Sequence, residues 1–314
     1  MHQTGCVEQL DTGPIQAADG IRDPEFRALL ERMGQRFAAQ EEEQPPALPA
    51  PQRRLPVFPH AARPVVNAMA RSALFACVQG KDRQILDNVL LATVAGVEIR
   101  FTGRQWNQDD HDLLMQLVHM AAPISLGEYV PLSGYAVLRA LGRDAGGTQY
   151  QALREDVRRL VTGTVSLRHS TQKVEYMGSL VEDAVHDERR HHWLIRLSPI
   201  LLTLYSPSAY TLVDWEQRRQ LRGKDLARWL HLYLATHAVP FPVKVATLKH
   251  LSGSRASALR TFRQQLRSAL AELRTVGALV TWEIDANDVL YVDRGTAVTE
   301  SQRQHITRHS QRLL

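Results

Sequence analysis

The alternation of apolar and polar residues predicts short helices and strands from residue 65 towards the end of the chain. Residues 107–120 repeat leucine and valine at the spacing of an amphipathic helix, and Asp109, Asp110 and Asp112 in the first turn suit the positive end of the helix dipole. The same spacing predicts further helices over residues 68–78, 133–141, 148–161, 224–237, 245–251 and 255–276. Alternating or apolar runs predict strands over residues 97–102, 164–169, 174–184, 192–197, 278–284 and 289–293.

These elements occur twice in the same order. Leu138 corresponds to Leu248 at an offset of 110 residues, the apolar positions of the two long helices match at 113, and Gly163 corresponds to Gly277 at 114. Two unrelated α+β units would also explain the elements, but the nearly constant offset favours a repeat. Three helices followed by a hairpin are typical of a winged helix, whose last helix faces the DNA major groove. The predicted fold is therefore α+β, mostly helical, with two winged-helix domains in tandem and a β-hairpin wing in each.

Positive charge is concentrated in the last third of the chain. The whole chain has 38 Lys and Arg residues against 33 Asp and Glu, whereas residues 215–314 have 16 basic and 8 acidic residues. Lysine and arginine bind phosphates with release of counterions, so this asymmetry favours a polyanionic partner such as double-stranded DNA. The presence of only two cysteines, the lack of a signal sequence and the lack of an apolar run of about 20 residues predict a cytoplasmic protein with no membrane partner.

Composition also predicts an N-terminal extension. Residues 1–51 contain 9 acidic and 4 basic residues, and seven prolines lie between Pro45 and Pro64. Proline fixes φ and lacks an N–H donor, which is typical of an extended linker, and one helix is predicted over residues 23–37. The predicted parts are a flexible acidic, proline-rich extension (residues 1–64), a winged-helix domain for dimerisation and auxiliary DNA contact (65–205), and a winged-helix domain for the main DNA contact (206–314).

The predicted helix over residues 255–276 has the pattern expected of a helix that lies in the major groove. Its large apolar residues fall on one side, and Arg260, Arg263, Arg267 and Arg274 form a second stripe about 90° away. Arginine can donate two hydrogen bonds to guanine, glutamine can pair with adenine, and the first turns of such a helix enter the groove deepest. A solvated basic face is the alternative. The predicted base contacts are Arg255, Ser257, Arg260, Thr261 and Gln264, and the predicted phosphate contacts are Arg263 and Arg267.

Further DNA contacts are predicted outside this helix. The helix N-terminus near Ser254 can donate backbone N–H groups to a phosphate, and Lys244 and Lys249 can contact the flanking backbone. Asp285 and Asp288 would repel phosphate, so the C-terminal hairpin is not expected to enter a groove tip first. In the nearly neutral first domain, the predicted backbone contacts are Arg154, Arg158, Arg168 and Lys173.

The sequence lacks the motifs of enzymes that hydrolyse nucleotides or nick DNA. The two Gly-Lys pairs, at residues 80–81 and 223–224, are each followed by aspartate and do not complete a P-loop. The histidines at 191–192 are adjacent, and adjacent side chains of a strand face opposite ways, so they are poorly placed to share a metal. His305 and His309 have helical spacing but no third ligand. We therefore expect no enzyme, no cofactor and no metal.

Several short segments are not required by a generic winged helix. They include Asp-Trp-Glu-Gln at residues 214–217 and Leu-Ala-Arg-Trp-Leu at residues 226–230. The others lie at residues 71–76, 78–81, 98–103, 178–180, 242–245 and 266–273. Together they resemble the TrfA-type replication initiators of broad-host-range plasmids over about residues 65–282.

The resemblance implies a tandem winged-helix protein that binds direct repeats, called iterons, at a plasmid origin. Family members open the adjacent A+T-rich duplex and recruit the host helicase and host initiator proteins. Dimers are the storage form and monomers the active form, in a bacterial cytoplasm where the protein associates with plasmid and nucleoid DNA. The main iteron-contacting helix maps onto residues 255–274. Members also bind the host sliding clamp through a Gln-Leu-x-Leu-Phe-like segment, of which residues 9–11 have the start but not the apolar end.

Two alternatives to an origin-binding initiator follow from the same residues. A winged-helix transcriptional repressor, including one that represses its own promoter, would use the same fold. An origin-nicking relaxase would be an enzyme. Direct repeats beside an A+T-rich tract indicate an origin, a single inverted repeat over a promoter indicates a repressor, and a covalent DNA adduct indicates a relaxase.

Overall fold

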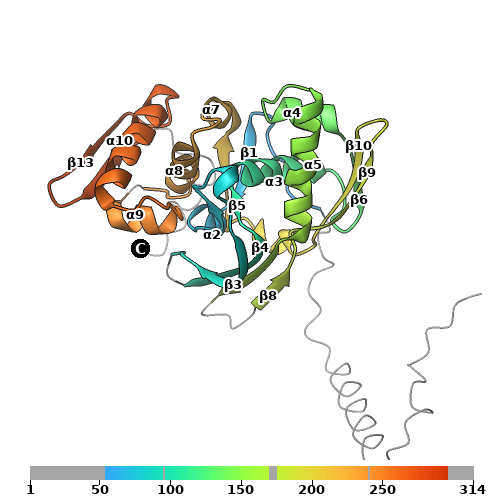
Figure 1. Cartoon of the computed structure of the whole chain (residues 1–314), viewed down its shortest axis with the longest axis horizontal. Coiled ribbons are helices and arrows are strands. Elements are labelled where there is room, and N and C mark those ends of the chain that lie inside the picture. Colours follow the sequence, from blue (N-terminus) through green and yellow to red (C-terminus); the bar gives the residue numbers. More distant parts are fainter. Residues whose placement is uncertain (1–53, 95, 170–174, 240, 296–314) are drawn as a thin grey trace, which may run out of the picture. The chain divides into compact units, whose positions relative to one another are not determined.

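The computed structural model describes residues 54–94, 96–169, 175–239 and 241–295 (Figure 1). They belong to one compact unit that begins at Gln52. The helix predicted over residues 23–37 and the candidate Lys173 lie outside the described residues.

The predicted extension ends earlier than residue 64. Leu55 and Phe58 are buried among apolar side chains, with 4% and 7% of their surface exposed. β1 (Ala62–Val66) pairs antiparallel with β11 (Tyr210–Asp214) in a two-stranded sheet. Pro64 lies in β1 because a strand with a free edge tolerates the missing N–H donor. The proline-rich composition therefore extends into the fold by about one strand.

Within the first half of this unit, which ends after β10, six elements follow the order helix, strand, helix, helix and hairpin. β6, β10 and β9 form an antiparallel sheet in that order, with β10 in the centre. The elements are α3 (Gln108–Ala121), β6 (Tyr129–Ser133), α4 (Gly134–Ala140), α5 (Gly147–Thr162), β9 (Val181–Asp187) and β10 (His192–Leu197). The predicted helices over residues 107–120, 133–141 and 148–161 are thus confirmed to within one or two residues.

The second half repeats this order. Its sheet order, β12-β14-β13, again places the last strand in the centre. The elements are α8 (Asp225–Ala235), β12 (Val243–Lys244), α9 (Val245–Leu251), α10 (Leu259–Thr275), β13 (Thr281–Ile284) and β14 (Val289–Asp293). The mixture of helices and strands confirms an α+β fold.

An insertion of two strands interrupts the repeat in the first half. β7 (Thr164–His169) and β8 (Glu175–Gly178) follow α5 and join β3 (Ile85–Leu91) and β4 (Val97–Arg104) in a sheet of order β3-β4-β7-β8. The equivalence of Gly163 and Gly277 is therefore wrong: Gly163 leads into β7, and a Cβ there would lie 2.5 Å from the Trp106 ring. Gly277 instead has a φ of 75° just after α10.

The single strand predicted over residues 174–184 is also wrong. β8 and β9 belong to different sheets, and the chain turns between them at residues 179–180. Leu180 and Val181 are fully buried there. The alternation of apolar and polar residues along one segment does not reveal where that segment leaves one sheet and joins another.

The helix predicted over residues 68–78 is mostly wrong. Only α2 (Asn67–Ala70) is helical, and β2 (Phe75–Ala76) pairs in parallel with β5 (Trp106–Asn107). The Phe75 ring stacks on His111 at 4.0 Å and on Trp106 at 5.3 Å between ring centroids. These contacts to residues more than 30 positions away outweigh local helix propensity.

Two hydrophobic cores are present in the described residues. The first contains α3, α4 and α5 with side chains from Leu55 to Trp215 and Leu232 of α8, and the second contains α9, α10 and other side chains of α8, from Leu221 to Leu290. Between and beside these elements lie short helical segments: η1 (Gly80–Asp82), α6 (Leu201–Leu204) and α7 (Trp215–Gln220). The domain limits 65–205 and 206–314 stay a prediction.

Candidate DNA-binding surface

α10 begins four residues later than the sequence predicts. Its N-cap is Ala258, whose side chain offers no cap, and the preceding residues 252–258 form a turn and loop. Arg255 explains the late start, because its guanidinium group donates to the Asp82 carbonyl and the Gln105 side chain of the first half. These donors are used within the chain, which argues against the predicted base contact of Arg255. Ser257 is exposed but likewise precedes the helix.

The apolar side of α10 is confirmed as its buried side. The helix packs on α8 and α9. Leu259 is partly buried, and the buried residues are Phe262, Leu266, Ala269, Leu270 and Leu273. This fixes which face of the helix meets solvent.

The opposite side of α10 presents Arg260, Gln264, Arg267 and Arg274, all exposed. Successive members are three to seven residues apart, so they lie along one face of the helix. Within the described residues, no side-chain hydrogen bond or ion pair involves these four residues. Their donors and charges are therefore available to a partner. Thr261 is also exposed, on the flank of this face.

Arg263 has a different environment from the other arginines of α10. Its guanidinium group donates two hydrogen bonds to the Asp288 carboxylate, at 2.6 Å from Nε and 2.5 Å from Nη2, and this pair lowers the pKa of Asp288. Asp288 lies in the turn between β13 and β14, where the Asp285 carboxylate accepts the N–H groups of Asn287 and Val289. Arg263 thus fixes the hairpin to the helix, which argues against its predicted role as a free phosphate contact.

The remaining predicted DNA contacts are spread over several elements outside α10. Lys244 is exposed at the start of α9, Lys249 is half-buried on α9, and Ser254 is half-buried in the turn before α10. In the first half, Arg154 of α5 pairs with Glu188, and Arg158 lies 3.7 Å from Glu155. Arg168 is exposed on β7. The structure therefore brings together the α10 residues but not those of the first half.

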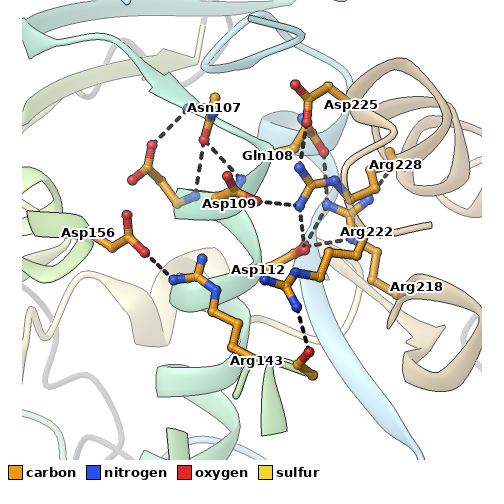
Figure 2. Close-up of polar contacts among 12 residues, drawn as sticks. Asn107, Gln108, Asp109, Asp112, Arg143, Asp156, Arg218, Arg222, Asp225 and Arg228 are labelled. Carbon is orange, nitrogen blue, oxygen red and sulfur yellow. Dashed lines mark hydrogen bonds and ion pairs between the residues drawn. The ribbon is translucent and has the colours of Figure 1, made fainter. Parts of the chain in front are cut away.

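Sequence reasoning missed an ionic cluster around two buried arginines, Arg218 and Arg228, between the two halves of the unit (Figure 2). Asp112 of α3 accepts from Arg218 of α7 at 2.6 Å and from Arg228 of α8 at 3.0 Å. Arg228 also donates to Asp109, at 2.7 Å, and to Asp225. Burial alone would lower the pKa of Arg228, but the carboxylates of Asp112, Asp109 and Asp225 raise it above its usual value. We name Asp109, Asp112, Arg218 and Arg228 the junction cluster.

Asp109 and Asp110 lie in the first turn of α3 as predicted, but Asp112 does not, and the aspartates have further roles. Asn107 caps α3 by accepting from the N–H groups of Asp109 and Asp110, and the Asp110 carboxylate accepts from the Asn107 N–H in return. Asp109 and Asp112 instead neutralise arginines from α7 and α8. Arginine partners more than 100 residues away could not be assigned to this short acidic run from the sequence.

The described residues contain no group of three or more His, Cys, Asp or Glu side chains placed to hold a metal ion. The His191 ring stacks on Tyr150 at 4.0 Å, and His192 begins β10. His305 and His309 lie outside the described residues. Of the helices in the described part of the chain, none is long and apolar enough to span a bilayer.

The sequence matches the TrfA protein family over residues 53–294. The chain belongs to the TrfA family. It is 27% identical over 228 residues to the plasmid replication initiator protein TrfA of Escherichia coli, a match that covers 70% of this chain and 59% of the relative. The match thus spans less than two thirds of the length of that TrfA protein.

Two solved structures are also partly similar to this chain. Domains 2 and 3 of RctB are 15% identical, with 73% of this chain and 90% of that chain covered and a TM-score of 0.48. The WH1 domain of the replication protein MSBI1.176 is 10% identical, with 31% of this chain and 81% of that chain covered and a TM-score of 0.24. The TrfA family match, which begins one residue before the described residues, includes both halves of the unit and all of α10.

Proposed function

We propose that this TrfA-family chain is a plasmid replication initiator that binds direct repeats at its origin with two winged-helix domains. In this proposal α10 lies in the major groove of a repeat. The observation that supports it is the exposed face of α10, where Arg260, Gln264, Arg267 and Arg274 have no hydrogen bond or ion pair within the described residues. Arginine and glutamine are the side chains that best distinguish guanine and adenine in that groove.

The repeated order of helices and hairpin supports the tandem winged-helix assignment. Each half has a long helix, α5 or α10, that follows a short helix and precedes a hairpin. In helix–turn–helix proteins, the helix in that position enters the major groove. Two such domains would cover a longer repeat than one domain, and repeats one helical turn apart would place neighbouring molecules on the same face of the DNA.

The proposed protein opens the duplex without chemistry of its own. Bending a site of 20–30 base pairs costs on the order of 1–6 kcal/mol, which binding to several repeats can supply. We propose that it is not an enzyme and that host initiator proteins and the host helicase complete the opening. A monomer–dimer equilibrium, contact with the sliding clamp and a location in the bacterial cytoplasm belong to the same proposal.

Footprinting of the purified full chain on the origin of the plasmid that encodes it tests the proposal. Arg260→Ala or Gln264→Ala should cost about 1–3 kcal/mol of binding free energy and relax the sequence preference, because each loses contacts to a base edge. Arg267→Ala should weaken binding to all sequences and reduce the slope of log K against log salt by about one, because one phosphate contact is lost.

Arg104→Ala is the matched control, since Arg104 is also exposed but lies on β4 of the other half. It should bind like the wild type. Wild-type footprints from the three α10 variants would show that α10 is not the DNA-binding element. A footprint on one inverted repeat over a promoter would instead indicate a repressor, and a covalent adduct on supercoiled DNA would indicate a relaxase.

A further inference from the structure

A cavity of about 270 Å³ lies between the two hydrophobic cores of the unit. Val213 of β11, from the first core, lines one part of it, and Leu234 of α8 and Leu273 of α10, from the second core, line another. An apolar cavity of about 150 Å³ is enough to hold benzene. The cavity is therefore large enough for a small organic molecule with one ring.

The wall of the cavity beside α10 is formed by residues with little or no side chain. Gly277 lines it where the chain turns after α10, with a φ of 75° that favours glycine, and the half-buried Ala278 follows. A Cβ at Gly277 would meet the Nε2 atom of Gln217 at 4.0 Å. The side-chain amide of Gln217 and Gly277 therefore lie close together on the wall of the cavity.

Gln217 of α7 is fixed at both ends. Its backbone N–H donates to the Asp214 carboxylate at 2.9 Å, and its Oε1 lies 3.3 Å from Nε2 of His231 on α8. Burial lowers the pKa of His231 to about 3, so the ring is neutral and has one N–H group. Because the Gln217 Oε1 atom can only accept, that N–H lies on Nε2 of the ring and donates to it.

This arrangement leaves two polar groups of the wall without partners. Among the described residues, the Nε2 amide group of Gln217 donates to no acceptor. His231 is 5% exposed, and its Nδ1 atom is buried with no hydrogen-bond partner in the described part of the chain. Buried polar groups are nearly always paired, so an unsatisfied pair of neighbours in the wall of a cavity calls for an explanation.

Two charged residues of opposite sign also line the cavity. Asp214 is exposed, and Arg294 donates to the carbonyl groups of Leu234 and His237, at 2.7 and 2.9 Å, at the end of α8. An ionic ligand of either sign would meet one like charge there. The lining therefore favours a neutral molecule over an anion or a cation.

We propose that this cavity binds a small, neutral and mostly apolar molecule whose carbonyl oxygen accepts a hydrogen bond from the Gln217 amide group. Sites for small molecules are lined mostly by apolar side chains, with a few polar groups that fix the orientation of the ligand. Because the walls belong to both hydrophobic cores, the bound molecule contacts both of them. Binding does not depend on the proposed DNA contacts, since Arg260, Gln264 and Arg267 lie outside the lining.

The test titrates the full chain with benzamide, which has a carbonyl group, and with toluene, which has a ring of the same size but no acceptor. Saturation-transfer NMR measures the affinity of each molecule. The wild type should bind both saturably. Gln217→Leu keeps an apolar wall but removes the donor, so it should weaken benzamide about 2- to 10-fold and leave toluene within about twofold of the wild type.

Two alanine variants locate the binding site. Ala278→Leu places a larger side chain at the cavity wall and should weaken both molecules, whereas Ala271→Leu, at an exposed position of α10, should bind them like the wild type. Thermal melting shows which variants are folded, and the ratio of the two affinities in Gln217→Leu decides the question even if Ala278→Leu does not fold. A wild type that binds neither molecule, a folded Ala278→Leu protein that binds both normally, or an unchanged ratio in Gln217→Leu would overturn the proposal.

Discussion

Asp112 of the junction cluster is the residue whose removal should destabilise the protein most clearly. In the described residues, the ion pair of Arg218 is with the Asp112 carboxylate alone. The side chain of Arg218 is fully buried. After Asp112→Ala, Arg228 keeps Asp109 and Asp225, whereas Arg218 keeps only neutral acceptors, the Gln108 side chain and the Arg228 carbonyl. Leaving one buried charge without its counter-charge costs about 3–5 kcal/mol.

Urea unfolding followed by tryptophan fluorescence measures this cost, since Trp229 lies on α8 next to Arg228. The free energy of unfolding should fall by about 3–5 kcal/mol for Asp112→Ala. Arg158→Ala is the control: its pair with Glu155 is 3.7 Å long and both side chains are more than half exposed, so it should cost at most about 1 kcal/mol. An Asp112→Ala protein as stable as the control would refute the assignment of the cluster.

The double variant Asp112→Ala/Arg218→Met separates the ion pair from general packing. The double variant removes the buried guanidinium group together with its counter-charge. Its free energy of unfolding should therefore fall by less than the sum of the losses in the two single variants. A coupling energy within about 0.5 kcal/mol of zero would show that the two residues act independently.

Two further predictions concern stability. Gly253 has a φ of 62°, and a Cβ there would lie 2.8 Å from the Ala76 Cβ, whereas Gly223 has a φ of 78° with open space around it. In urea unfolding, Gly223→Ala should lower the free energy of unfolding by about 1–2 kcal/mol, from backbone strain alone. Gly253→Ala should lower it clearly more, because the added Cβ also meets Ala76. Equal losses would refute the close packing of the turn at Gly253 on β2. Burial lowers the pKa of His231 to about 3, and the positive charges of Arg218 and Arg294 lower it in the same direction. Below pH 6.5 the unfolded chain therefore binds a proton at His231 that the folded chain does not bind. Stability should therefore fall as the pH falls from 6.5 towards 3, and between pH 7 and pH 5 the wild type should lose about 2 kcal/mol more than His231→Leu; equal losses would contradict a neutral buried His231.

The elements that the sequence predicted best are those whose boundaries depend on nearby residues. α9, β7, β10 and β14 match their predicted limits, and Gly142, with a φ of 68°, follows the end of α4. Local spacing and a glycine at the C-terminus carry this information. The apolar side of α10 was predictable for the same reason.

The errors occur where a distant partner decides the local structure. Arg255 does not continue α10 because Asp82 and Gln105 bind its side chain, and both lie at least 150 positions away. Phe75 forms a strand rather than a helix because of Trp106 and His111. A single sequence gives the residue types in such contacts but not which residues meet.

The same limit affects the choice of DNA-binding residues. A stripe of arginines on a helical wheel gives equal weight to Arg260 and Arg263, yet only Arg263 has a carboxylate partner, Asp288. A paired guanidinium group must give up that partner before it can bind a phosphate, so pairing lowers its contribution even when the residue remains partly exposed. By this criterion the arginine candidates on α10 reduce to Arg260, Arg267 and Arg274, and the neutral Gln264 is unaffected. The same criterion adds the arginines of the β9–β10 turn, Arg189 and Arg190, which the sequence analysis did not consider. Glu188 binds Arg154, whereas Asp187 accepts from backbone N–H groups of the turn and keeps its own negative charge beside these arginines.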